Sequence, residues 1–248
     1  MHRALAFALV CAAACGGKPA APAPPGDGDP DGDYLSDAQE ALYGTDPANP
    51  DTDGDEVLVG TSPTDPKSRI YQGGWPFQRF KNKIVDPGFK GTAKVGAVVP
   101  HFVAVDQFGQ KVDLYDFALK KKPVVLDLSA DWCGACKEIA AWLDGKPPSF
   151  ELPPELAVIP GKVKAGEIYW VTVYFQNAGS GPATAADVAA WAAKYPNPRV
   201  AVLADTDQAM FNFLFPGGYP NINVVNEDMT FRTYERYDYR TSLASVVK

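Results

Sequence analysis

The sequence is short of positive charge and has no long apolar run. Its formal net charge of −7 argues against nucleic acid as a partner and against electrostatic attachment to anionic lipid. No apolar stretch is long enough for an ordinary membrane-spanning helix. The 248 residues, 46% of them hydrophobic, are still enough to fill the core of one or two domains.

Cysteine and histidine are scarce as well, with 4 and 2 residues. We expect Cys11 and Cys15 to be removed or modified at the N-terminus, which leaves Cys133 and Cys136. A single pair excludes a disulfide-stapled scaffold. A zinc site is disfavoured, because there is no second Cys-x-x-Cys and the mature chain keeps only His101. A static disulfide is the plain alternative, but so small a loop constrains the unfolded chain little. The pair is therefore predicted to be reactive.

The N-terminus predicts export. Residues 1–14 have a short basic start and a run of small apolar residues, as in a signal peptide. Residues 12–17, Ala-Ala-Ala-Cys-Gly-Gly, resemble a bacterial lipobox, although Ala12 stands where leucine is usual. We predict lipidation of Cys15 and a place in the bacterial cell envelope, in the periplasm or at the outer membrane. Secretion after an ordinary cleavage is the alternative. Residues 15–26, rich in proline and alanine, are predicted to be an extended linker.

Residues 27–68 are predicted to be a small, loop-rich acidic module that binds calcium. Five acidic residues stand at relative positions 1, 3, 5, 9 and 12, which is the ligand spacing of an EF-hand-like loop: Asp29, Asp31, Asp33, Asp37 and Glu40. Tyr34 occupies position 6, where that loop has glycine. The stretch is similar to the thrombospondin type 3 calcium repeats, including the trailing Gly44-Thr45-Asp46-Pro47.

A partial second copy follows, with Asp51, Asp53 and Asp55 in the same alternation. It lacks a counterpart to residues 34–39, so either it is a degenerate site or its carboxylates complete a site shared with the first copy. A solvated acidic spacer is the alternative for the whole module. Because the module has little apolar content, we expect it to fold when a cation neutralises its carboxylates.

Residues 69–93 are predicted to be a linker that docks through its aromatic side chains. Trp75, Phe77, Phe80 and Phe89 stand among glycine and proline residues, with Ile84 between them. We expect them to pack on the domain that follows. A role in peptide binding is the less favoured alternative.

The strand, turn and helix around the cysteine pair can be predicted from local pattern. Residues 124–130 form a short apolar run that begins with two valines, which indicates a buried strand. Residues 137–143 contain good helix formers, and Gly145 with the prolines after it ends them. Cys133 therefore lies at a helix N-terminus, where unpaired N–H groups and the helix dipole favour a thiolate.

Three motifs give the chain a family resemblance. Residues 132–137, Trp-Cys-Gly-Ala-Cys-Lys, resemble the active site of thioredoxin-fold oxidoreductases, with Ala135 in place of the usual proline. Asp127 matches a carboxylate that this family buries, and residues 218–220, Gly-Tyr-Pro, match its cis-proline. Residues 95–102 resemble the opening of the TlpA-type or redoxin class. The resemblance implies that residues 94–248 form a thioredoxin-like α/β domain with a mixed central sheet and helices on both faces.

The rest of this domain is predicted from pattern and turn signals. We expect hairpins, a long proline-rich loop over 146–166, and helices that include one capped by Thr184. The elements are a hairpin over 102–114, strands over 168–175 and 200–203, helices over 184–195 and 208–214, a hairpin over 221–237 and a terminal helix over 242–248.

The resemblance implies thiol–disulfide exchange. Cys133 attacks and Cys136 resolves the mixed disulfide. Asp127 accepts a proton from Cys136, unless it is a carboxylate satisfied by backbone donors. Trp132, Tyr219 and Pro220 form the substrate surface. We predict a protein disulfide reductase that needs no cofactor for this chemistry. Its partners would be disulfide-containing or dithiol client proteins and an electron-donor thiol protein, and oxidation or isomerisation stays open.

Three other functions can be compared with the residues that each of them would need. A peroxidase of the redoxin class needs serine or threonine three residues before the nucleophile, where this chain has Ala130. Copper delivery of the related kind needs Cys-x-x-x-Cys and a histidine near the C-terminus, and neither is present. A calcium-dependent surface or structural module on a thioredoxin scaffold is the remaining alternative. Its activity would survive Cys133→Ser and be lost with a chelator.

Overall fold

The computed structural model describes residues 28, 30–31, 36–43, 45–49, 52, 71–78, 81–149 and 151–247. The predicted signal peptide, the lipidated Cys15 and the linker over 15–26 lie outside the described residues, and so do five of the predicted metal ligands: Asp29, Asp33, Asp51, Asp53 and Asp55. None of the helices that the structure describes is both long and apolar enough to span a membrane.

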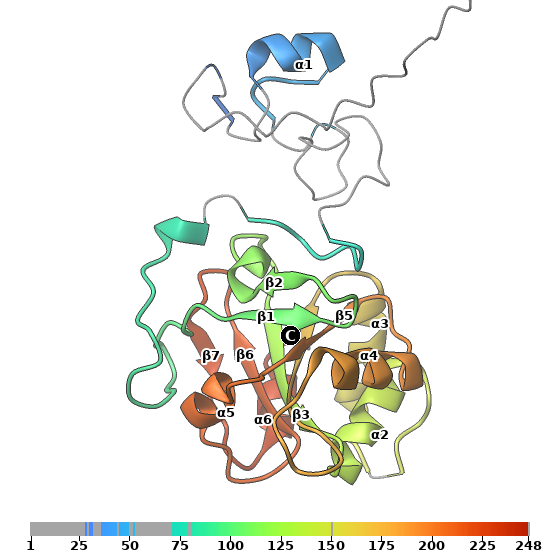
Figure 1. The fold of residues 1–248 in the computed structure, drawn as a ribbon. Helices are drawn as coiled ribbons and strands as arrows, with labels where there is room; N and C mark the ends of the chain where they lie inside the picture. The colour runs from blue at the N-terminus through green and yellow to red at the C-terminus, as the bar shows by residue number, and fades with distance from the viewer. Residues whose placement is uncertain are drawn as a thin grey trace, which may run out of the picture.

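A mixed seven-stranded sheet carries the domain (Figure 1), as predicted, with strand order β2-β1-β5-β4-β3-β6-β7. β3 runs parallel to β4, and β4 parallel to β5, whereas the other pairs are antiparallel. The strands are β1 (Val103–Asp106), β2 (Lys111–Asp113), β3 (Val124–Ala130), β4 (Tyr169–Gln176), β5 (Val200–Ala204), β6 (Asn221–Val225) and β7 (Phe231–Thr233).

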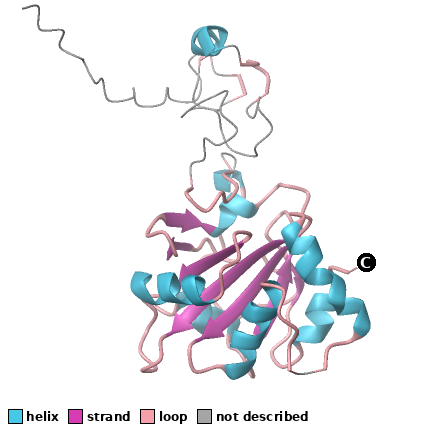
Figure 2. Cartoon of the chain, turned by 90° about the vertical axis from the view of Figure 1, so that its right-hand side faces the viewer, coloured by secondary structure: helices cyan, strands magenta, loops and turns pink. Residues whose placement is uncertain are grey.

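Helices cover both faces of this sheet (Figure 2), again as predicted. On β4, the Tyr174 ring lies 5.0 Å from Trp191 of α4, while the next residue, Phe175, stacks 4.6 Å from Phe211 of α5. Successive strand residues point to opposite faces, so α4 and α5 lie on opposite sides. The helices are α1 (Asp37–Tyr43), α2 (Gly134–Leu143), α3 (Ile159–Lys164), α4 (Ala185–Lys194), α5 (Ala209–Leu214) and α6 (Tyr239–Ala244), with 3-10 turns η1 (Lys81–Lys83), η2 (Leu114–Phe117) and η3 (Pro154–Val158).

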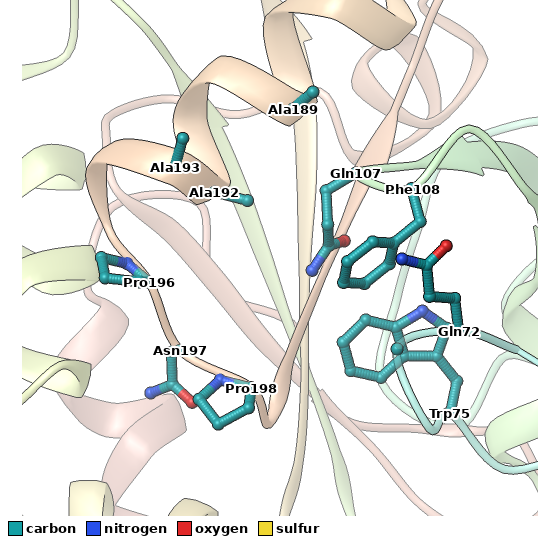
Figure 3. Close-up of a pocket in the computed structure, with 11 residues that line it drawn as sticks. Gln72, Trp75, Gln107, Phe108, Ala189, Ala192, Ala193, Pro196, Asn197 and Pro198 are labelled. Carbon is teal, nitrogen blue, oxygen red and sulfur yellow. The ribbon is translucent and has the colours of Figure 1, made fainter.

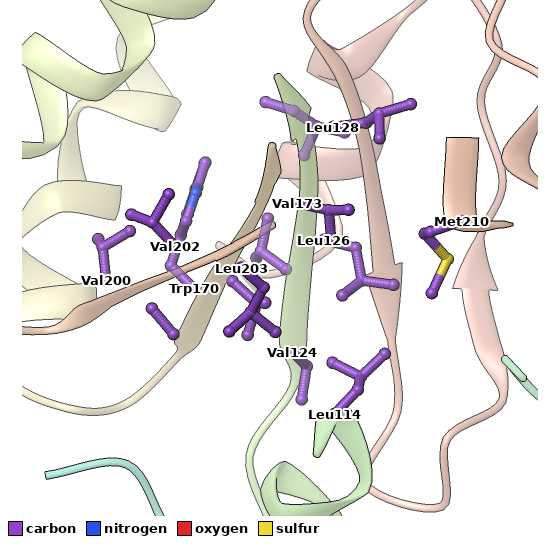
Figure 4. Packing of buried hydrophobic residues seen from close by; sticks show 14 of the residues in the cluster. Leu114, Val124, Leu126, Leu128, Trp170, Val173, Val200, Val202, Leu203 and Met210 are labelled. Atoms are coloured by element: carbon purple, nitrogen blue, oxygen red, sulfur yellow. The ribbon is translucent and has the colours of Figure 1, made fainter. Parts of the chain in front are cut away.

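The core is built on β3, all seven residues of which are buried. Aliphatic side chains of the inner strands gather on the face that α5 covers (Figure 4), among them Leu126, Leu128, Val173 and Leu203, and Met210 of α5 is buried against the same core. A strand covered on both faces is apolar along most of its length, here all but Asp127 and Ser129, which explains why the run over 124–130 could be recognised.

Two predicted elements differ in the structure. The segment 146–166 is not a single loop, because it contains η3 and α3. Ile159 and Val163 stand four residues apart and bury one face of α3, and Pro160 is accommodated in its first turn. The terminal helix spans Tyr239–Ala244 instead of 242–248, since the Asp238 side chain accepts a hydrogen bond from the Arg240 N–H and caps it three residues earlier. The Thr184 cap is confirmed, with a capping box to Asp187.

The segment before the domain docks on it, as its aromatic residues predicted. Trp75 is buried and its Nε1 donates to Asp106 Oδ2 at 2.8 Å. Tyr71 is buried as well, and its hydroxyl donates to Asp116 Oδ2 at 2.6 Å. Phe89 packs edge-on against Phe102 and Phe213. Phe80 lies outside the described residues. Residues 71–78 thus share the core of the domain, and the boundary at residue 94 stays a prediction.

The Trp75 contact gives a test of this docking. We expect Trp75→Phe to lower the free energy of unfolding by about 3 kcal/mol, because it leaves a cavity and removes the donor from a buried carboxylate oxygen. Trp132→Phe makes the same change at an exposed site and should stay within about 0.5 kcal/mol of wild type. Urea unfolding measures both. Equal effects of the two variants would contradict the docking.

Candidate active site

The end of β3 and the start of α2 hold the two cysteines together. Cys133 is the N-cap of α2 with extended backbone, and its Sγ accepts a hydrogen bond from the Cys136 N–H at 3.1 Å. The two residues form a disulfide across the first helical turn. The predicted strand–turn–helix is therefore confirmed, and the Cys133 sulfur lies where a helix terminus stabilises negative charge.

The two cysteines differ in exposure, in the order expected if Cys133 attacks and Cys136 resolves the mixed disulfide. Cys136 is fully buried, whereas 5% of Cys133 is exposed. Of the two residues, only Cys133 therefore keeps any exposed surface, and that surface is small. Access depends on the residues that frame it.

Asp127 lies in the middle of β3, buried between Thr172 of β4 and Ile222 of β6 in the strand register. Burial raises the pKa of its carboxyl group to about 6, because the low-dielectric interior disfavours the charged form. Three side chains donate to the carboxylate and partly offset this: Ser129 Oγ at 3.0 Å, Thr172 Oγ1 at 3.3 Å and Trp170 Nε1 at 3.4 Å.

The donors to Asp127 are thus side chains and not the backbone groups that the alternative prediction named. None of these three donors was predicted from the sequence. A signal was present, since Trp170 and Thr172 stand two apart on one strand and share a face. Ser129 has the same spacing from Asp127. Polar residues at every second position of apolar strands therefore mark this face.

An aromatic cluster frames the disulfide. The Trp132 ring lies edge-on to Tyr219 at 5.1 Å and to Phe175 at 6.2 Å. Phe175 stacks between Tyr219 at 5.4 Å and Phe211 at 4.6 Å. Trp132 also donates from Nε1 to Gln176 Oε1 at 3.0 Å. Trp132 and Tyr219 were predicted, whereas Phe175 and Phe211 were missed, because their contacts join strands and helices far apart in sequence.

The Tyr219–Pro220 peptide is cis, as the Gly-Tyr-Pro motif predicted. Trp132 precedes Cys133 in the chain and Tyr219 precedes Pro220, so the contact between their rings places the proline loop beside the cysteine pair. The structure therefore brings together Cys133, Cys136, Trp132, Tyr219 and Pro220. What each of them does stays a prediction.

The described part of the acidic module contains three of the predicted metal ligands. Glu40 and Asp31 are buried, while Asp37 is exposed at the start of α1. Thr45 Oγ1 donates to Glu40 Oε1 at 3.4 Å. Buried carboxylates are the oxygen ligands that Ca²⁺ takes, so these residues fit that ion. Within the described ranges, no three His, Cys, Asp or Glu side chains gather in a metal-binding cluster.

A separate hollow of about 520 Å³ lies between residues 72–75, Gln107–Phe108, α4 and the prolines after it (Figure 3). Its polar groups are largely engaged elsewhere. The Gln107 amide donates to the Val200 carbonyl and accepts from the Val202 N–H. The hollow is therefore mainly apolar, and it shares no residue with the disulfide site.

Comparison with known proteins gives a family model for the acidic module and similar solved structures for the domain after it. The model of the bacterial TSP3 repeat matches residues 29–50. No curated protein matches the chain. Among solved structures, the thioredoxin domain of a thiol-disulfide oxidoreductase from Bacteroides vulgatus is 17% identical, covers 63% of this chain and 100% of its own, and has a TM-score of 0.44.

Two further structures are similar in the same way. A protein assigned as the thiol:disulfide interchange protein DsbE from Chlorobium tepidum is 18% identical, with 63% and 100% coverage and a TM-score of 0.47. The exposed lipoprotein thioredoxin Etrx1 from Streptococcus pneumoniae is 19% identical, with 59% and 97% coverage and a TM-score of 0.42. The assignment of the fold rests on strand order and on the placement of the cysteine pair and cis-proline.

The fold and the site together define a thioredoxin-like domain with a Cys-x-x-Cys pair. In this chain the domain is preceded by a bacterial TSP3 repeat.

Asp127 makes stability depend on pH. Its pKa is about 6 in the folded protein against 3.8 for an ordinary aspartate, so the folded state holds an extra proton between these values. Stability is therefore expected to fall as the pH rises from 4 to 7, by about 2 kcal/mol from this group. Asp127→Asn should remove that part of the decrease, as measured by urea unfolding of the oxidised protein. The exposed Glu155→Gln should keep the wild-type slope. A wild-type slope in Asp127→Asn would show that the carboxyl titrates normally.

Proposed function

We propose that this protein is an extracytoplasmic thiol–disulfide oxidoreductase that reduces disulfides in client proteins. The observation that carries the proposal is the Cys133–Cys136 disulfide at the start of α2, beside the Tyr219–Pro220 loop. A structural disulfide across one helical turn adds little constraint to the unfolded chain. Reversible chemistry explains its position at a helix terminus better.

The reaction proceeds through a mixed disulfide. In the reduced protein the Cys133 thiolate attacks one sulfur of the client disulfide. A bond forms between Cys133 and that sulfur, and the second client sulfur leaves as a thiolate. The Cys136 thiolate then attacks the Cys133 sulfur and releases the first client sulfur. The client gains two electrons, the protein is left oxidised, and an electron-donor thiol protein returns it to the dithiol.

Asp127 is proposed as the proton acceptor for Cys136. It lies in the strand that leads to the cysteine pair, on the sheet face that α2 covers, since Ala140 and Leu143 of α2 line a small cavity with Thr172. With a pKa of about 6 the carboxyl is largely ionised at neutral pH and can take a thiol proton. Because the Asp127 carboxyl group is buried, it exchanges protons with groups inside the domain and not directly with solvent.

The direction of the reaction is proposed from the weak stabilisation of the thiolate. Strong oxidants hold their reduced form in an especially stable state. Here Gly134 and Ala135 add no charged or donor side chain between the cysteines, and Lys137 lies 3.7 Å from Asp131. The helix terminus is thus the main support for the Cys133 thiolate, which favours a reductase.

Two cysteine variants test the reaction. Cys133→Ser should lower reduction of a disulfide-bonded client to the rate of buffer alone, because no accessible sulfur is left. Cys136→Ser should attack the client and accumulate the mixed disulfide, visible on a non-reducing gel. Equilibration of the wild-type pair with glutathione should give a potential closer to about −270 mV than to about −120 mV. Full activity of Cys133→Ser would rule out the enzyme and favour the calcium-dependent surface module.

For the acidic module we propose calcium binding, because the TSP3 match covers the residues whose spacing predicted it. Glu40 and Asp31 would be central ligands, since both are buried and a cation offsets the cost of burying their charge. The exposed Asp37 would be a peripheral one.

Calcium titration of the full chain tests this ranking. We expect Asp31→Asn and Glu40→Gln each to weaken binding by at least about tenfold, equal to about 1.4 kcal/mol. Asp46→Asn makes the same change of charge in the same module but outside the predicted ligand set, so it should bind as wild type. Equal affinities for all four proteins in isothermal titration calorimetry would contradict the site.

The place of the protein in the cell is also proposed. The signal-like residues 1–14 and the lipobox-like residues around Cys15 support export and a lipid anchor, and the proline-rich stretch after them supports a spacer from the membrane. Its partners would be exported proteins that carry disulfides, together with the donor of thiols.

A further inference from the structure

Exposed aromatic side chains gather around the loop that carries the cis-proline. Phe215 is 58% exposed, Tyr237 73% and Trp132 45%, and they are among the most exposed large apolar residues of the described chain. Phe215 begins the loop that ends at Pro220. Tyr237 contacts the middle of that loop, and Trp132 contacts Tyr219 near its end.

Arg236 contacts the rings of both Phe215 and Tyr237. The Arg236 guanidinium lies 4.6 Å from the centre of the Phe215 ring and 5.5 Å from that of Tyr237. Its Nε donates to the Phe215 carbonyl at 2.9 Å, and the Arg236 carbonyl accepts from the Gly217 N–H at 3.0 Å. Phe215, Arg236 and Tyr237, which we name the outer platform, are thus tied to the proline loop by hydrogen bonds and ring contacts.

Because Gly217 has no side chain, the Tyr237 ring can approach the backbone of the proline loop closely. A Cβ on this residue would lie 2.2 Å from the Tyr237 Cε1, so the Tyr237 ring rests directly on the Gly217 backbone. The Tyr237 residue nevertheless remains 73% exposed. Tyr237 therefore rests on the loop and still offers most of its surface to another molecule.

Phe215 has an unfavourable backbone for its side chain. It ends α5 in the left-handed region, with φ of 42°, where glycine or asparagine is usual. An exposed ring at such a position adds little to the stability of the fold. A role in contacting another molecule accounts for a large apolar side chain there.

We propose that the outer platform selects clients by binding aromatic or aliphatic side chains that flank the client's cysteine. This inference rests on the proposed function, because the reaction brings an extended client segment to Cys133 past Trp132 and Pro220. The platform continues that surface along the same loop and offers two ring faces and a guanidinium. Such surfaces bind aromatic side chains at low entropic cost, since their own rings are already ordered.

Two peptide disulfides test the inference. They share one sequence but carry phenylalanine in one case and serine in the other on both sides of the cysteine. The full chain is reduced and mixed with each, and the second-order rate constant is measured by acid quench. We expect wild type to prefer the phenylalanine peptide by about tenfold, and the Phe215→Asn/Tyr237→Ser double variant to prefer it less than twofold. A preference that survives in this variant overturns the inference.

Leu119→Asn is the matched control. Leu119 is also apolar, 43% exposed and left-handed with φ of 58°, but it precedes β3, at the opposite end of that strand from Cys133. The control should keep the tenfold preference, and its loss there would also overturn the inference.

A small disulfide such as oxidised glutathione separates the two proposals. If reduced wild type reacts with it and shows no preference between the peptides, the platform is wrong and the proposed function stands. If wild type reacts with none of the three disulfides, the proposed function fails and the platform with it.

Discussion

The burial of β3 on both faces is the constraint on which the rest of the structure depends. Apolar residues of this strand form the core on the side of α5, and Asp127 is held on the other side among three donors. Because the strand is fixed along its whole length, the residues after it are positioned with little freedom. Cys133 therefore lies at the start of α2 with its sulfur directed at the first turn.

Much of this arrangement could be predicted from local sequence. The apolar run over 124–130, the cysteine spacing and the Gly-Tyr-Pro motif each depend on neighbours in the chain, and all three are confirmed. α3 was missed, because proline and glycine in its first turn indicate a loop more strongly than Ile159 and Val163 indicate a helix. Two of the three donors to Asp127 and the ring partners of Tyr219 come from other parts of the chain. A local pattern shows which residues share a face of a strand, but it does not specify such contacts.

The acidic module and the thioredoxin-like domain are stabilised by different kinds of interaction. The domain gains its stability from apolar burial, and its ionisable groups are held by donors such as those around Asp127 and Asp106. The module has few apolar side chains and buries Glu40 and Asp31. Burying like charges costs free energy unless a counter-charge is present, so under the proposed calcium binding the folding of this module would depend on the cation concentration.

The difference in exposure between the two cysteines has a kinetic consequence. Of the two cysteines only Cys133 keeps any exposed surface. In the proposed reaction the client and the electron donor would therefore use the same narrow opening in turn. Neither can bind productively while the other occupies it. The steady-state kinetics should then follow a double-displacement scheme with parallel double-reciprocal lines, in which an excess of donor competes with the client for one face of the molecule.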